Sequence, residues 1–242
     1  MNNYGKEVSI MKKSMNYIIP GLLVMAVVIM SLMKSPEKIA EMLSNISSEL
    51  TVFSVFIHLI LLVVIATGLI VKKYRNIVFF SFIAFLSLSA TVISTIYMIP
   101  TNILMFAAIF VLIIYAWLNK ELNFEFYDIT PSNKYFGVLA LIFGFWYLHW
   151  VESPIGINAL LYSPLGSVNC PTLLTICGFL CLTAKPRLVT LNLVVAVFTL
   201  YFGIFGIFLL GAYVDIVLVI CALFLIVRSA FYATHNDVFD KK

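Results

Sequence analysis

Eight long apolar segments constrain the fold of this chain more than any other feature of its sequence. They lie at about residues 15–33, 51–71, 77–98, 101–118, 135–151, 171–184, 188–209 and 212–228. A helix needs about 20 apolar residues to cross the hydrocarbon core of a bilayer. In lipid the backbone polar groups must be satisfied inside the protein, and the segments lack the period-two alternation of barrel strands. The sequence therefore predicts an all-α polytopic bundle of about eight transmembrane spans.

The composition supports this fold class. Of the 242 residues, 63% are hydrophobic and 11% are charged, whereas soluble domains are roughly half apolar and a quarter charged. These values exclude a soluble globular protein, a disordered chain, a collagen-like fibre and a nucleic-acid-binding protein. The polar stretches 119–134 and 229–242 are too short to fold separately. We therefore interpret residues 1–242 as a single integral membrane domain whose main partner is the lipid bilayer.

The distribution of Lys and Arg predicts the orientation. If all eight segments cross the membrane, thirteen of the 15 basic residues lie on one side. The other two, Lys34 and Lys38, follow the first segment. Because cytoplasmic loops are enriched in Lys and Arg, both termini are predicted to be cytoplasmic in a protein of the cell membrane. No small-x-small cleavage site follows residues 15–33, so we expect a retained first span rather than a signal peptide.

Two connecting segments have distinctive patterns. Residues 35–49 predict an amphipathic helix, either interfacial or simply connecting, in which Ser35 can cap and Pro36 suits the first position. Its apolar residues share one face: Ile39, Leu43, Ile46 and Leu50. The loop 152–170 is apolar, rich in Gly and Pro, and carries one charge. The segment after it, 171–184, would span only about 21 Å as a helix. The loop could thus be re-entrant or a surface loop that packs on the bundle.

Ionisable residues within the segments are few, and they gather toward the predicted outer side. His58, His149 and Asp215 lie inside or at the ends of spans, and Glu152 follows the fifth span. Such groups are costly in lipid and are candidate binding residues. Together with Cys170 they form a hypothetical outward-facing polar site. Asp215 would need a partner, for which His58 and His149 are the candidates; simple structural pairing is the alternative.

The cysteines offer a second hypothesis. Cys170 stands at the predicted start of a helix, where the dipole stabilises a thiolate. Cys177 and Cys181 follow seven and eleven residues later, so the three sulfurs form one stripe that could pass a soft metal such as Cu(I). Cysteine is equally common as a small packing residue. No CxxC, zinc-ligand spacing, nucleotide-binding loop or hydrolase motif occurs, so no cofactor is implied.

Two further groups have structural explanations. Trp146, Tyr147 and Trp150 suit an aromatic belt at the level of the lipid headgroups. Gly203, Gly206 and Gly211 would let the seventh segment approach its neighbours closely.

The stretch 164–228 resembles an uncharacterised bacterial family of polytopic membrane proteins, domain of unknown function 6064. The resemblance rests on Cys-Pro-Thr at 170–172, on Thr175 and Gly178, on Pro-Arg at 186–187, on Leu-Leu-Gly at 209–211 and on Asp215. Asn169 stands where the family pattern has Pro. The resemblance covers about a quarter of the chain. It implies a membrane location and no known activity, and it singles out these positions: Cys170, Pro171, Thr172, Arg187 and Asp215.

Three functions remain open at this point. The first is a transporter-like protein that binds a small solute or a soft metal through Cys170, Asp215, His58, His149 and Glu152. The second is a non-catalytic membrane subunit or scaffold that packs against another membrane protein. The third is a membrane enzyme of thiol or redox type that uses Cys170. We expect binding rather than catalysis, because no resolving cysteine lies at bridging distance from Cys170 on the same helix.

Overall fold

The computed structural model describes residues 18–31, 35–124, 129–147, 159–184 and 189–239. Within these ranges the chain is helical and contains no strand. The first helix is Ile18–Ser31. The others are α2 (Pro36–Glu49), α3 (Thr51–Ile70), α4 (Arg75–Ile96), α5 (Pro100–Leu118), α6 (Pro131–Phe145), α7 (Ala159–Tyr162), α8 (Asn169–Cys181), α9 (Val189–Leu209) and α10 (Ile216–Phe239). Short 3-10 turns, η1 (Lys72–Tyr74) and η3 (Tyr213–Asp215), precede α4 and α10.

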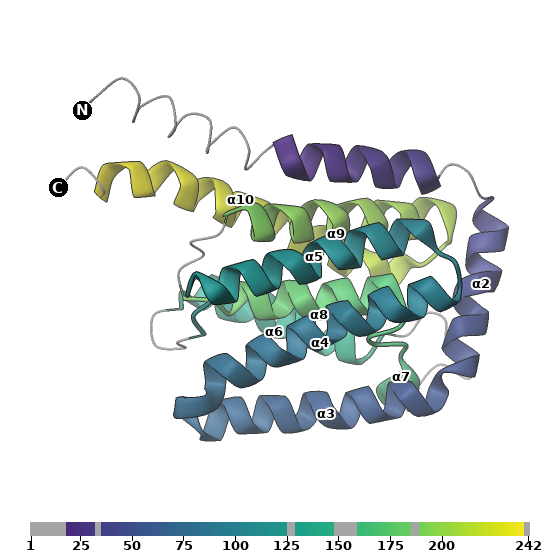
Figure 1. Cartoon of the computed structure of the whole chain (residues 1–242), viewed down its shortest axis with the longest axis horizontal. Coiled ribbons are helices and arrows are strands. Elements are labelled where there is room, and N and C mark those ends of the chain that lie inside the picture. The colour runs from purple at the N-terminus through teal and green to yellow at the C-terminus, as the bar shows by residue number, and fades with distance from the viewer. Residues whose placement is uncertain (1–17, 32–34, 125–128, 148–158, 185–188, 240–242) are drawn as a thin grey trace.

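The long helices run side by side and alternate in direction, while α2 crosses one end of the bundle (Figure 1). We call this end the α2 end. α3, α5, α8 and α10 begin there, and α4, α6 and α9 end there. Helix α2 is bent by 99° from the helix Ile18–Ser31. It therefore turns across the bundle instead of extending the first helix.

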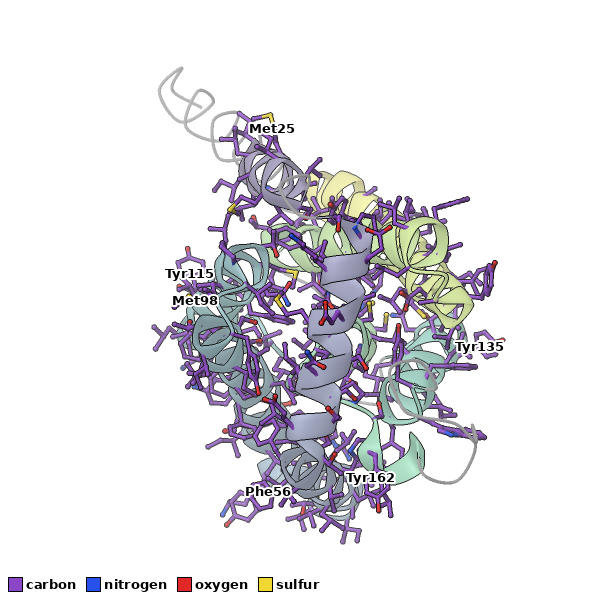
Figure 2. The ribbon with its side chains drawn as sticks, turned by 90° about the vertical axis from the view of Figure 1, so that its right-hand side faces the viewer. Met25, Phe56, Met98, Tyr115, Tyr135 and Tyr162 are labelled. Carbon is purple, nitrogen blue, oxygen red and sulfur yellow. The ribbon has the colours of Figure 1, made fainter. Side chains whose placement is uncertain are left out.

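Among the described residues, five helices are long and apolar enough to cross a membrane, or six if the bent pair Ile18–Ser31 and α2 counts as one span. The five are α3, the unit of η1 and α4, α5, α9, and the unit of η3 and α10. Large apolar side chains stand out from the sides of the bundle, among them Met25, Phe56 and Tyr115 (Figure 2). A soluble monomer rarely exposes so much apolar surface. Helix composition and surface together suggest a membrane protein.

Each of the eight predicted segments contains a helix, but three of these helices are shorter than a simple span. α6 has 15 residues and α8 has 13, and 14 residues of the first helix are described. At about 1.5 Å per residue, α8 is only about 20 Å long. The prediction of an all-α bundle is thus confirmed, whereas the number of crossings stays a prediction.

Helix α8 lies inside the bundle. All 13 of its residues are buried, which is possible because it contacts α4, α6, α9 and α10. Glycines bring α6 against it: a Cβ added at Gly178 would lie 3.0 Å from the Gly137 carbonyl oxygen, and one added at Gly144 would overlap Thr175. Close approach through small residues is the usual way that membrane helices gain contact area.

The chain enters α8 through a buried turn. Residues 163–168 have almost no exposed surface. Gly166 adopts a positive φ of 78°, its N–H is bonded to Thr172 Oγ1, and its carbonyl accepts from Ser89. The second part of the predicted loop 152–170, from residue 163 on, is therefore enclosed by protein, where irregular backbone is tolerated at membrane depth, whereas Leu161 and Tyr162 are exposed.

Helix α2 has the amphipathic character that the sequence predicts. Ser35 is its N-cap, and its hydroxyl accepts from the Lys38 N–H at 3.5 Å. Leu43 and Ile46 are buried against the α2 end, whereas Glu37, Lys38 and Glu41 are exposed. Figure 2, which looks onto this end, shows α2 lying across the ends of the other helices. This is the arrangement of a helix that lies in the plane of a membrane interface.

Candidate functional site

A buried carboxyl group forms the centre of the candidate site. Asp215, in η3, has no exposed surface. Its two oxygens accept hydrogen bonds from Tyr147 Oη and, at 3.4 Å, from Cys170 Sγ. Tyr147 is fully buried and Cys170 is 2% exposed. The site thus joins three segments at the α2 end: the residues after α6, the first turn of α8, and the turn before α10.

The turn between α9 and α10 places Asp215. Gly211 has a positive φ of 66°, and the Ala212 N–H donates to the Gly206 carbonyl at 2.9 Å. A Cβ added at Gly206 would overlap the Asp215 carboxylate. Gly206 therefore makes room for the carboxyl group, and Gly203 lets α9 approach α10, with an added Cβ at 2.9 Å from Val219. The third predicted glycine, Gly211, serves the turn and not helix contact.

A small pocket opens beside this site, with a cavity volume of about 50 Å³. The helix Ile18–Ser31, α2, α5, α8 and α9 all contribute to its wall, which is mainly apolar. Polar side chains line it at the end of the first helix and at the starts of α5 and α8: Ser31, Thr101, Asn102, Asn169 and Cys170. The Cys170 thiol thus lies between the pocket and Asp215.

His58 supports the site from a distance. It is fully buried in α3, with Nδ1 2.7 Å from the Ser54 carbonyl and Nε2 2.8 Å from the Phe145 carbonyl. The prediction that His58 pairs with Asp215 is therefore wrong, because both ring nitrogens face backbone oxygens. Phe145 ends α6 and lies two residues before Tyr147. His58 thus holds the end of the helix that delivers Tyr147 to Asp215.

Arg228 occupies the other end of α8. It is 5% exposed, and its guanidinium donates to the carbonyls of Leu180 at 2.7 Å and Thr183 at 2.5 Å. Arg228 follows Asp215 by 13 residues, which matches the 13 residues of the parallel helix α8. α10 therefore places an acid at the start of α8 and a base at its end, the order that complements the helix dipole.

The remaining cysteines lie inside the bundle. Cys177, Cys181 and Cys221 are fully buried free thiols. In the described part of the chain, no group of three or more His, Cys, Asp and Glu side chains is placed to hold a metal ion. The soft-metal hypothesis for the stripe of Cys170, Cys177 and Cys181 gains no support from this geometry.

Other predicted residues have mixed outcomes. His149 and Glu152, with Trp150, lie outside the described residues, as does Arg187. Trp146 is 40% exposed, as an aromatic belt requires.

Two residues of this region were not identified from the sequence. For Tyr147 the belt prediction is wrong, because the side chain is buried on Asp215. Arg228 was counted only as a cytoplasmic charge, although its position within an apolar run could have indicated a buried cation.

Comparison with known proteins gives no further guide to this site. The resemblance to domain of unknown function 6064 stays a prediction. No protein-family model, no curated protein and no solved structure matches the chain.

Proposed function

We propose that the protein is a transporter-like integral membrane protein that binds a small solute in the pocket beside Asp215. One observation carries this proposal: the pocket ends at Cys170, whose thiol donates to a fully buried carboxyl group. Acids are rare inside membrane bundles because their burial is costly. Where they occur they usually face the interior and mark the path of a solute or proton.

The proposed topology has eight crossings, with both termini cytoplasmic and the α2 end outside. In support, the long helices alternate in direction, and the connections rich in Lys and Arg lie at the end opposite α2 (Figure 1). Lys72 and Lys73 lie in η1, and Lys120 follows α5. α8 is too short for a simple span, but it is enclosed by other helices, where short or broken helices occur in transporters.

The geometry also favours a second candidate, a thiol enzyme, through one contact. Asp215 accepts from Cys170 at the start of a helix, so a carboxylate is placed to take the thiol proton. Catalysis would then depend on the sulfur alone. Replacement of Cys170 by Ser would abolish it, whereas solute binding would be altered less.

Side-specific modification of Cys170 tests the transporter proposal without knowledge of the substrate. The other three cysteines are replaced by Ala, and a small membrane-impermeant methanethiosulfonate is applied to right-side-out and inside-out vesicles. A transporter alternates in access, so Cys170 should react from both sides. A matched variant that retains only Cys221, which is buried away from the pocket, should react from neither.

Each other outcome contradicts the proposal. Reaction from one side only would indicate a binding protein whose site does not alternate in access between the two sides of the membrane. No reaction from either side would favour the scaffold hypothesis, in which the buried polar groups serve packing and another membrane protein is the partner.

A further inference from the structure

The lining of the pocket indicates the class of its ligand, an inference that rests on the proposed function. We propose that the pocket binds the polar end of an uncharged acylglycerol, a glycerol that carries an acyl chain. The hydroxyl groups would contact Asn102 and Asn169, and the acyl chain would leave along the apolar wall.

The pocket wall contains two hydroxyl groups, of Ser31 and Thr101, the Cys170 thiol and two amide groups, and the amides are the groups that we expect to contact the ligand. Asn102 is 2% exposed and has no hydrogen bond to another described residue. Asn169 is 5% exposed, and its amide oxygen receives only a long contact from Cys170 at 3.9 Å. Buried amides without partners are costly. Each offers both N–H donors and a carbonyl acceptor, which suits a hydroxyl group, since a hydroxyl also donates and accepts.

The lack of charged side chains in the described pocket wall further limits the chemical class of the ligand. Among the described residues that line the pocket there is no Lys, Arg, His, Asp or Glu. Asp215 lies behind Cys170 and its oxygens are already bonded. A phosphate, a carboxylate or an ammonium group would thus be buried without a counter-charge, which costs several kcal/mol. The neutral glycerol end of a lipid avoids this cost.

The apolar wall matches an acyl chain at the membrane interface. Met42 and Leu43 of α2 and Phe202 and Phe205 of α9 all line the pocket. Because α2 is amphipathic and crosses the end of the bundle, its buried face lies at the depth where headgroups meet acyl chains. The first part of an acyl chain can therefore pack here while the rest stays in the bilayer.

Photocrosslinking with a defined lipid tests the proposal. The probe is a monooleoylglycerol with a diazirine in its acyl chain, added to the full chain in phosphatidylcholine nanodiscs. We expect saturable labelling of peptides from α2 and α9, which unlabelled monooleoylglycerol removes. Lysophosphatidic acid of the same chain length differs by its phosphate and should not compete. Labelling of the lipid-facing groove between α3 and α4, near Phe56 and Phe85, should not saturate.

Variants locate the polar contacts. Asn102→Leu and, separately, Asn169→Leu should weaken saturable labelling about threefold to tenfold, the effect of one lost hydrogen bond. Asn192→Leu is the matched control, because it removes a buried amide of α9 that does not line the pocket. Circular dichroism melts identify any variant that fails to fold. If one of the two Asn variants fails to fold, the labelling of the other variant tests the polar contacts.

The outcomes separate this inference from the proposed function. Labelling that does not saturate, or that lysophosphatidic acid removes equally, overturns the acylglycerol site even if Cys170 still reacts from both sides of the membrane. Saturable labelling with a Cys170 that reacts from neither side supports the lipid site and contradicts the transporter.

Discussion

The contact between Arg228 and the end of α8 gives the sharpest prediction of stability. Arg228→Met replaces the aliphatic stem by an unbranched apolar side chain and removes every donor. In this variant the Leu180 carbonyl still accepts a hydrogen bond from Thr183 Oγ1 at 2.7 Å. The Thr183 carbonyl, by contrast, loses its bond from Arg228 and has no other donor among the described residues. A buried carbonyl without a hydrogen-bond donor costs about 1–3 kcal/mol of stability. Loss of the interaction between the cation and the helix dipole costs at most about 2 kcal/mol more.

Relief of the buried charge offsets part of this loss, so we expect a net destabilisation of about 1–4 kcal/mol. For a chain of this size the midpoint of thermal unfolding should fall by about 2–16 °C, at about 2–4 °C per kcal/mol. Arg228→Lys retains one cationic donor group and should lose about half as much. The assay is a circular dichroism melt in detergent, with the exposed residue Lys134 changed to Met as the charge-matched control. A midpoint for Arg228→Met equal to that of the control would refute the reasoning.

Three other changes test separate contacts. Gly178→Ala should lower the melting midpoint because its Cβ would press on α6, whereas Gly21→Ala meets no atom within 4 Å and should be neutral or stabilising in the same melt. Tyr147→Phe removes a donor to the buried carboxyl and should cost about 1–3 kcal/mol in the same melt. A hydrogen bond to Glu49 raises the pKa of Tyr97, so this contact stabilises the fold below the usual tyrosine pKa and is lost as pH rises through the raised value. In an ultraviolet titration of tyrosinate, the component that Tyr97→Phe removes should ionise at lower pH in the Glu49→Gln variant.

Much of the fold was predictable because membrane helices follow from length and apolar composition. The predicted segment 51–71 corresponds to α3, Thr51–Ile70, and the predicted gap between segments 77–98 and 101–118 separates α4 from α5. The cap of α2 at Ser35 was also predicted, since a capping residue and a following Pro act locally. What hydropathy did not predict is that α8 is enclosed, because that depends on the glycines of α6 that allow close contact.

The site was predicted only in part. Cys170 and Asp215 were expected at one end of the bundle, and they are in contact there. Tyr147 was missed because α6 ends at Phe145, before the end of the predicted segment 135–151, so the ring turns inward from irregular backbone. Arg228 was missed because its burial depends on carbonyl groups 48 and 45 residues away in the chain. Long-range contacts of this kind leave no local signal in a sequence.

The central claim is that a pocket reaches Cys170 beside Asp215 while the rest of α8 is enclosed, and the four native thiols test it most directly. The folded protein in nanodiscs is treated with methyl methanethiosulfonate, and the modified peptides are mapped by mass spectrometry. The structure predicts that Cys170 is modified first, because it lines the pocket, while Cys177, Cys181 and Cys221 stay protected. Equal reactivity of all four thiols, or a Cys170 as unreactive as the others, would contradict the account.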